Sequence, residues 1–150
     1  MDISIIVDGI KFNLRTAVII ETENGYIFEK DTFAKNEIDK YYFVVGGRIT
    51  SNEKSEDAAK REIEEELGIK IGNIKLKAIM ESFFTLENIK FHEICFYYKY
   101  KIDGIINLPE NYYVFSKEEM KTKNIKPIII NDIINSEDND IMHIVLNENI

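Results

Sequence analysis

The sequence has little cysteine, and its single thiol limits the chemistry that cysteine can perform. Cys95 has no second cysteine with which to form an intramolecular disulfide. It lies in the apolar run from Ile94 to Tyr98, where a buried thiol behaves as a small hydrophobic side chain. A catalytic thiol would need a nearby histidine, and His92, three residues away, falls on the other face of a strand. We therefore expect Cys95 to be structural.

Clusters of basic residues and long apolar runs are also absent. Lysine and arginine total 19 against 27 acidic residues, so the formal net charge is −8, and the basic residues are scattered. Such a chain repels duplex DNA, so we exclude polymeric nucleic acid as a partner. A small phosphorylated substrate is compatible, because divalent cations can bridge an acidic protein and an anionic ligand. Without a basic leader or a long apolar stretch, we expect no signal peptide, no membrane helix and a cytoplasmic location.

Length and composition indicate a globular protein. The chain has 150 residues, of which 45% are hydrophobic and 31% charged, values that are ordinary for a soluble domain. A chain of this length can bury a core without disulfides or structural metals. We predict a single domain over residues 1–150.

The residue pattern predicts several strands, one clear helix, more strands and then short helices. Turn pairs at Asp8-Gly9 and Asn24-Gly25 separate the first strands. Strands are predicted over 3–7, 12–21, 26–30, 41–45, 74–84, 91–102, 112–115 and 142–146. Short helices are predicted over 116–120, capped by Ser116, and over 127–135, with Pro127 in the first turn. This order indicates a mixed α/β (α+β) layer fold.

The clearest helix is predicted over residues 55–67. Ser55 is expected to cap its start, acidic residues in the first turn suit the helix dipole, and Gly68 follows its end. The apolar residues of this segment recur every four positions and predict one buried stripe. That stripe consists of Ala59, Ile63 and Leu67.

Three carboxylates lie on another sector of the same helix. Glu62, Glu65 and Glu66 are spaced i, i+3 and i+4, so they fall within one third of the circumference, whereas Glu64 points to solvent. These carboxylates repel one another, and a bound cation would relieve the repulsion. Oxygen ligands in this number suit Mg²⁺ or Mn²⁺, which share a substrate's phosphates. Taken alone, however, acidic residues on a helix more commonly form a solvated face.

The residues around the carboxylates resemble the signature of the Nudix hydrolase family, G-x5-E-x7-R-E-U-x-E-E-x-G-U with U aliphatic. The chain reads GRITSNEKSEDAAKREIEEELGI from Gly47 to Ile69 and matches every fixed position. Seven fixed identities would coincide by chance on the order of 10⁻⁸ times per start position. The resemblance extends over about residues 12–145. It implies the Nudix fold, a mixed β-sheet between helices, with a loop–helix–loop that holds metal against a diphosphate.

The resemblance also implies which residues bind the metal. Glu62, Glu65 and Glu66 would be the Mg²⁺ ligands and the catalytic carboxylates. Glu62 could alternatively act as the catalytic base. The carbonyl group of Gly46 would bind the same metal, since glycine allows a close approach of the backbone.

Other motif residues have implied structural roles. Arg61 and Glu53 would form a salt bridge that fixes the loop against the helix. Gly47 and Gly68 would serve the backbone geometry. The family often has a proline before the double glycine, and Val45 replaces it here, which removes some rigidity but no ligand.

Some family members take a catalytic base from outside the motif. Glu93 is our first choice, because a charge among apolar neighbours is costly unless it is paired or bound to metal. The alternative for Glu93 is a cross-strand salt bridge. Glu81 and Glu110 are weaker candidates for the same role. His92 and His143 are more often surface or hydrogen-bonded residues than ligands.

A few residues are candidates for substrate binding. Arg48, just after the double glycine, could meet a phosphate or face solvent. Phe83, Phe84, Tyr112 and Tyr113 could stack on a base, a contact that contributes about 1–3 kcal/mol. Aromatic residues on strands are nevertheless more often part of the core.

The resemblance thus implies Mg²⁺-dependent hydrolysis of a phosphoanhydride bond in a nucleoside diphosphate linked to another moiety. The substrate class stays open between a nucleoside triphosphate, ADP-ribose, a nucleotide sugar and a dinucleoside polyphosphate. Loops at 31–40 and 85–90, not the motif, would read the base or sugar. The alternative is a regulator that binds a nucleotide without cleaving it, which a lost carboxylate or a DNA-binding appendage would favour. Homodimers are common among relatives, and the sequence does not decide the oligomeric state.

Overall fold

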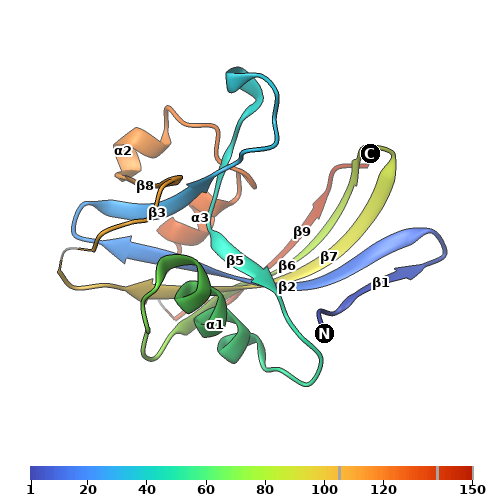
Figure 1. Cartoon of the computed structure of the whole chain (residues 1–150), viewed down its shortest axis with the longest axis horizontal. Coiled ribbons are helices and arrows are strands. Elements are labelled where there is room, and N and C mark those ends of the chain that lie inside the picture. The colour runs from blue at the N-terminus through green and yellow to red at the C-terminus, as the bar shows by residue number, and fades with distance from the viewer. Residues whose placement is uncertain (105, 138, 150) are drawn as a thin grey trace.

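A mixed sheet lies between the helices (Figure 1). The structure is a computed structural model that describes residues 1–104, 106–137 and 139–149. Its strands are β1 (Ser4–Val7), β2 (Ile10–Thr22), β3 (Gly25–Lys30), β4 (Tyr42–Phe43), β5 (Val45–Arg48), β6 (Lys75–Leu86), β7 (Ile89–Lys101), β8 (Tyr112–Phe115) and β9 (Met142–Asn147). Its helices are α1 (Ser55–Leu67), α2 (Lys117–Met120) and α3 (Ile130–Asn135), with a 3₁₀ turn η1 (Glu37–Asp39).

The nine strands form one sheet around β2. The main path is β4-β3-β2-β7-β6-β9, with β2–β7 and β6–β9 parallel and the other pairs of this path antiparallel. The long strand β2 pairs with β7 along one edge and with β1, β5 and β3 in turn along the other. This arrangement places β5, which carries the double glycine, beside the middle of β2.

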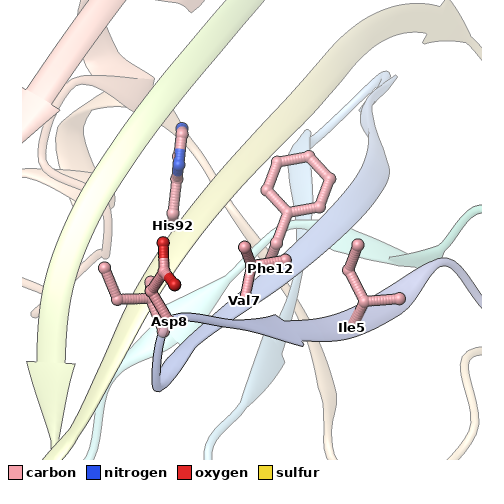
Figure 2. A pocket seen from close by; sticks show the side chains of 6 residues that line it. Ile5, Val7, Asp8, Phe12 and His92 are labelled. Atoms are coloured by element: carbon pink, nitrogen blue, oxygen red, sulfur yellow. The ribbon is translucent and has the colours of Figure 1, made fainter.

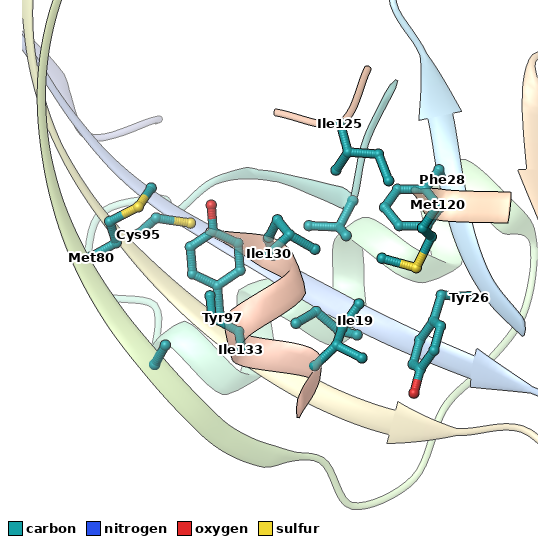
Figure 3. Close-up of a cluster of buried hydrophobic side chains, with 14 of the residues drawn as sticks. Ile19, Tyr26, Phe28, Met80, Cys95, Tyr97, Met120, Ile125, Ile130 and Ile133 are labelled. Carbon is teal, nitrogen blue, oxygen red and sulfur yellow. The ribbon is translucent and has the colours of Figure 1, made fainter. Parts of the chain in front are cut away.

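Two hydrophobic clusters fix the helices to the two faces of the sheet. On one face, Ala59, Ile63 and Leu67 of α1 pack against Val18 and Val45, so the predicted buried stripe is confirmed. On the other face, residues of α2 and α3 pack against β2, β3, β6 and β7 (Figure 3). The expectation of a mixed sheet between helices is therefore confirmed.

Helix α1 spans Ser55–Leu67 as predicted, but the capping role predicted for Ser55 is wrong. Its N-cap residue is Lys54 and makes no side-chain cap, so Ser55 is the first helical residue instead. The Ser55 hydroxyl lies 2.6 Å from the Tyr98 hydroxyl, and the Ser55 carbonyl accepts a hydrogen bond from Thr16 Oγ1 at 3.2 Å. Ser55 thus anchors the helix to the sheet. The other end agrees, since Gly68 has a left-handed backbone and ends the helix.

Three smaller boundaries also differ. The strand expected over 41–45 is divided into β4 and β5, and the double glycine lies inside β5 because it pairs with β2. The loop expected at Leu86–Lys90 is a two-residue turn, because only Glu87 and Asn88 lie between β6 and β7. Pro127 precedes the last helix, which begins at Ile130.

Candidate active site

Gly47 of β5 lies directly against the side chain of Glu62 of α1. Gly47 pairs with Thr16 across β5 and β2 and faces α1, and the carboxylate of Glu62 lies against its α-carbon. A methyl group at Gly47 would overlap that carboxylate. Glycine is also required at position 46, because a methyl group added at Gly46 would overlap the Thr16 carbonyl and Ala17 of β2. The two glycines therefore provide space as well as backbone geometry.

Arg61 joins the loop before α1 to the helix, as the motif implied. Its Nε and Nη2 atoms donate to the two carboxylate oxygens of Glu53, both at 2.9 Å. Nη2 also donates to the carbonyl of Arg48 at 3.1 Å, which attaches the helix to β5. Glu53 accepts two further hydrogen bonds from Thr50, from the backbone nitrogen and the hydroxyl. These donors, Arg61 first, hold the pKa of Glu53 at about 2.

The third nitrogen of Arg61 faces two carboxylates of the motif helix. Nη1 lies 3.0 Å from Glu62 Oε1 and 3.4 Å from Glu65 Oε1. Glu62 is only 13% exposed, whereas Glu65 is 57% exposed. Burial raises the pKa of Glu62, and the hydrogen bond and charge of Arg61 oppose that rise. One guanidinium therefore serves three acidic residues and leaves excess negative charge.

Glu66 has partners that the sequence analysis missed. The Tyr112 hydroxyl donates a hydrogen bond to Glu66 Oε2 and lies 3.2 Å from Glu29 Oε1. Burial, the charge of Glu66 and a hydrogen bond with Glu66 raise the pKa of Glu29 to about 7. Tyr112 and Glu29 are paired across β8 and β3. No linear pattern could reveal this group, because Glu29 and Tyr112 are 83 residues apart in the sequence.

The donor set fits a hard divalent cation. Glu62, Glu65 and Glu66 lie on one patch of α1, all ligand atoms are oxygens, and Gly47 leaves room for a carboxylate beside the backbone. Within residues 1–104, 106–137 and 139–149, no three acidic, histidine or cysteine side chains already converge on one point. Glu62 and Glu65 turn to Arg61, and Glu66 turns to Tyr112. A cation held by all three carboxylates would therefore require their side chains to turn from these partners.

Glu93 lies on the other face of the sheet from these carboxylates. It is paired with Asn13 across β7 and β2, and the odd-numbered residues of both strands face α3. Asn13 Nδ2 donates to Glu93 Oε2 at 2.7 Å, and the hydroxyl of Ser4 donates to Asn13 Oδ1 at 2.5 Å. The carboxylate of Glu93 is therefore hydrogen-bonded by the amide of Asn13. It neither forms the cross-strand salt bridge considered above nor lies beside Glu62.

The remaining polar candidates lie apart from the carboxylates of α1. Glu81 pairs with His143 on the neighbouring strand, with Oε2 and Nε2 2.6 Å apart. Glu110 is exposed in the turn before β8. His92 lies between two aromatic rings, Phe12 at 5.3 Å and Phe83 at 4.5 Å between centroids. The structure brings none of these to the motif helix.

The substrate-binding candidates are also spread over the molecule. Phe84 stacks on Phe91, with ring centroids 4.9 Å apart. Phe83 and Phe84 are neighbours on β6 and point to opposite faces, so they do not line one site. Arg48 is adjacent to Gly47 but faces away from α1, and its guanidinium lies 4.0 Å from Asp2. Of the candidates Arg48, Phe83 and Phe84, Arg48 is nearest in the sequence to the motif glycines.

Two pockets in the structure lie away from the motif helix. The first, of about 310 Å³, lies between side chains of the β1–β2 hairpin and His92 of β7 (Figure 2). It is lined by Ile5, Val7, Asp8, Ile10, Phe12 and His92. The second, of about 410 Å³, lies between α2 and α3. The carboxylates of α1 instead lie beside β5, with Glu65 exposed and Glu62 largely buried.

Comparisons with known proteins agree with this geometry. A MutT protein from Bacillus halodurans is 20% identical over 87% of this chain and 89% of its own, with a TM-score of 0.67. A MutT NUDIX hydrolase from Burkholderia pseudomallei is 18% identical over 84% and 98%, with a TM-score of 0.66. An Ap4A hydrolase from C. elegans is 12% identical over 82% and 93%, with a TM-score of 0.59. At these identities the likeness shows a shared fold.

The family of the chain follows from its match to a family model. No curated protein matches the sequence. In the part of the chain that the structure describes, no helix is long and apolar enough to cross a membrane. The family description "NUDIX domain" matches residues 11–129, which include the whole motif and the strands that carry it. The chain therefore belongs to the Nudix family and has the Nudix fold.

Proposed function

We propose that this Nudix protein is a Mg²⁺-dependent hydrolase of a phosphoanhydride bond in a nucleoside diphosphate linked to another moiety. The observation that carries the proposal is the position of Glu62 against Gly47, beside Glu65 and Glu66, with one guanidinium shared by Glu62, Glu65 and Glu53. A solvated acidic face would need no such fit, and glycine would give no advantage at that position. The arrangement is instead suited to oxygen ligands held close to a backbone strand.

The chain's own residues have separate parts in this reaction. Glu65 and Glu66, with the carbonyl of Gly46, would hold Mg²⁺, and Mn²⁺ is an acceptable substitute. The bound ion would offset charge on the phosphates and orient the attacking water. Arg61 and Glu53 hold the helix and the loop in register, as their short contacts support. Their contribution is to position the carboxylates and not to touch the substrate.

The proposed step is hydrolysis with a balanced exchange of bonds. The oxygen of water forms a bond to one phosphorus, and the bond from that phosphorus to the bridging oxygen breaks. The bridging oxygen leaves on the second phosphate, and the proton of water passes to a carboxylate. Glu62 is placed for that transfer better than Glu93, since Glu62 lies on the same face as Glu65 and Glu66. We therefore assign the base to Glu62 and not to Glu93.

The substrate class calls for a direct screen. A panel of a nucleoside triphosphate, ADP-ribose, a nucleotide sugar and a dinucleoside polyphosphate is incubated with and without Mg²⁺, and the released products are measured. Release from at least one compound, dependent on Mg²⁺ and lost in Glu65→Gln and Glu66→Gln with the fold retained, would support the proposal. Full activity in either variant would overturn it. Tight nucleotide binding without release from any compound would favour the regulator.

Other properties belong to the same proposal. We propose that residues 1–150 act as one domain on a small molecule in the cytoplasm, and not on polymeric nucleic acid or at a membrane. The net charge of −8 supports the exclusion of a polyanion. A homodimer is supported by the exposed apolar side chains of Ile5, Ile6 and Val7 on β1. Sedimentation equilibrium would measure the oligomeric state, and a monomer at high concentration would refute the dimer.

A further inference from the structure

Tyr112 connects the motif helix to strands that lie outside the motif. Its hydroxyl donates to Glu66 Oε2 and lies 3.2 Å from Glu29 Oε1. Tyr112 and Glu29 are opposite each other in the antiparallel pair β8–β3, so their side chains point to the same face of the sheet, the face of α1. Two strands thus place one hydroxyl and one carboxylate against the end of α1.

Glu66 depends on this hydroxyl more than its neighbours do. Glu62 and Glu65 both contact Arg61, but among the described residues Glu66 takes part in no ion pair. A carboxylate on a helix end keeps rotamer freedom unless a partner fixes it. The hydrogen bond from Tyr112 provides one such partner, and Glu29 forms a further hydrogen bond with Glu66. The bond from Tyr112 occupies one lone pair of Oε2, and the lone pairs of the carboxylate that neither partner uses stay available to a cation.

We propose that Tyr112 is a positioning residue that orients Glu66 for divalent cation binding, with Glu29 holding the hydroxyl from the other side. The inference rests on the proposed function, because it assumes that Glu66 binds a cation. Groups that hydrogen-bond to a metal ligand fix its orientation, and their loss typically lowers metal affinity by about 10–100-fold. Tyr112 has this relation to Glu66, although it lies 46 residues away in the sequence.

The variant Tyr112→Phe tests the hydroxyl alone. The ring of Tyr112 packs against the apolar cluster beneath α1, and phenylalanine keeps that packing. The matched control is Tyr113→Phe, because Tyr113 is the next residue on β8, is 40% exposed and has ring contacts with Tyr42 and Phe115. Circular dichroism and the thermal midpoint without metal show whether each variant is folded.

The main readout is direct binding of Mn²⁺, measured by the loss of the free-ion electron paramagnetic resonance signal. We expect Tyr112→Phe to raise the Kd for Mn²⁺ about tenfold and Tyr113→Phe to leave it unchanged. In turnover, the metal concentration for half-maximal rate should rise by the same factor, with the substrate KM at saturating metal unaltered. An unchanged Mn²⁺ Kd in Tyr112→Phe would overturn the proposal.

Two further variants separate the possible failures. If the wild type binds no Mn²⁺, or Glu66→Gln binds it normally, the proposed function and this inference both fail. If Glu66→Gln loses binding but Tyr112→Phe does not, only this inference fails. Glu29→Gln removes a charge but keeps a hydrogen-bonding partner for the Tyr112 hydroxyl, so we expect it to raise the Mn²⁺ Kd less than Tyr112→Phe does. Should Tyr112→Phe not fold, a loss of affinity in Glu29→Gln as large as in Glu66→Gln would show Glu29 to be a ligand and overturn the positioning role.

Discussion

The carboxylate of Glu62 lies against the α-carbon of Gly47, in the space that a side chain at that position would fill. This contact relates two motif residues that are separated by most of the motif. It explains why a strand residue must be glycine even though its backbone is extended and paired with Thr16. The position of the carboxylate, and not a left-handed turn, imposes the requirement.

Gly47→Ala should therefore displace Glu62 and reduce turnover without unfolding the protein. A displacement of about 1 Å at a catalytic group can lower the rate about 10²-fold, and we expect a loss of that order in kcat. The matched control is Gly72→Ala, since a methyl group at Gly72 meets no atom within 4 Å. Steady-state kinetics would measure the turnover of both variants, and circular dichroism would show whether each is folded. Equal activity in the two variants would contradict the importance of this contact.

The salt bridge between Glu53 and Arg61 should make stability depend on pH in the acid range. The pKa of Glu53 in the folded protein is about 2, below its ordinary value of 4.5. A lowered pKa means that the stabilisation is fully present above about pH 4.5 and is lost as the pH falls towards 2. Glu53→Gln should lower the free energy of unfolding by about 1–2 kcal/mol at neutral pH, and its stability should depend less on pH in the acid range.

Urea unfolding of wild type and Glu53→Gln at pH 7 and at pH 3 would measure the effect. The exposed pair Glu118–Lys121 offers a control, because the Glu118 side chain is 83% exposed. Glu118→Gln should leave the free energy of unfolding nearly unchanged at both pH values. The prediction is wrong if the difference between wild type and Glu53→Gln is as large at pH 3 as at pH 7.

Glu62→Gln and Glu93→Gln should affect catalysis very differently. Glu62 lies beside Glu65 and Gly47, whereas Glu93 binds Asn13 on the opposite face of the sheet. We expect Glu62→Gln to lower kcat at least about 10²-fold and Glu93→Gln to keep it within about threefold. Single-turnover measurements at saturating metal would test this. A larger loss in Glu93→Gln would return the catalytic base to β7.

The thiol of Cys95 should be inert in the folded protein. Burial raises its pKa to about 12, so almost no thiolate exists at pH 8. A disulfide reagent that yields a coloured thiol should react with Cys95 only after addition of concentrated guanidinium chloride, and then to one equivalent per chain. Rapid reaction in native buffer would contradict the burial of Cys95 between β2 and β6.

Much of this architecture was predictable, because local patterns determine it. The order of strands, the buried stripe of α1 and the left-handed end at Gly68 follow from periodicity and turn residues. The Arg61–Glu53 bridge followed from the motif. Ser55 was placed wrongly as a cap, because its hydroxyl found a partner on β7 that propensity does not consider.

The features that the sequence did not predict depend on contacts between residues far apart in the chain. Whether a strand residue faces α1 or α3 depends on register, and this placed Glu93 with Asn13 instead of with Glu62. Lys77 is fully buried at an irregular position of β6 and donates to the Glu137 carbonyl, although a lysine on a strand suggests a solvent-facing residue. No local pattern contains the information that pairs these residues.

The parallel pairing of β2 with β7 has a consequence for how the protein acquires its structure. Partners in this pair, such as Thr16 and Phe96, are 80 residues apart, and the motif lies entirely in the chain between them. A pairing of such high contact order is slow to form, because a long loop must close before it contributes stability. During synthesis, α1 therefore has no finished surface on which to pack until β7 has left the ribosome. A chain that ends before residue 89 would contain the complete motif but lack the β2–β7 pairing that supports it.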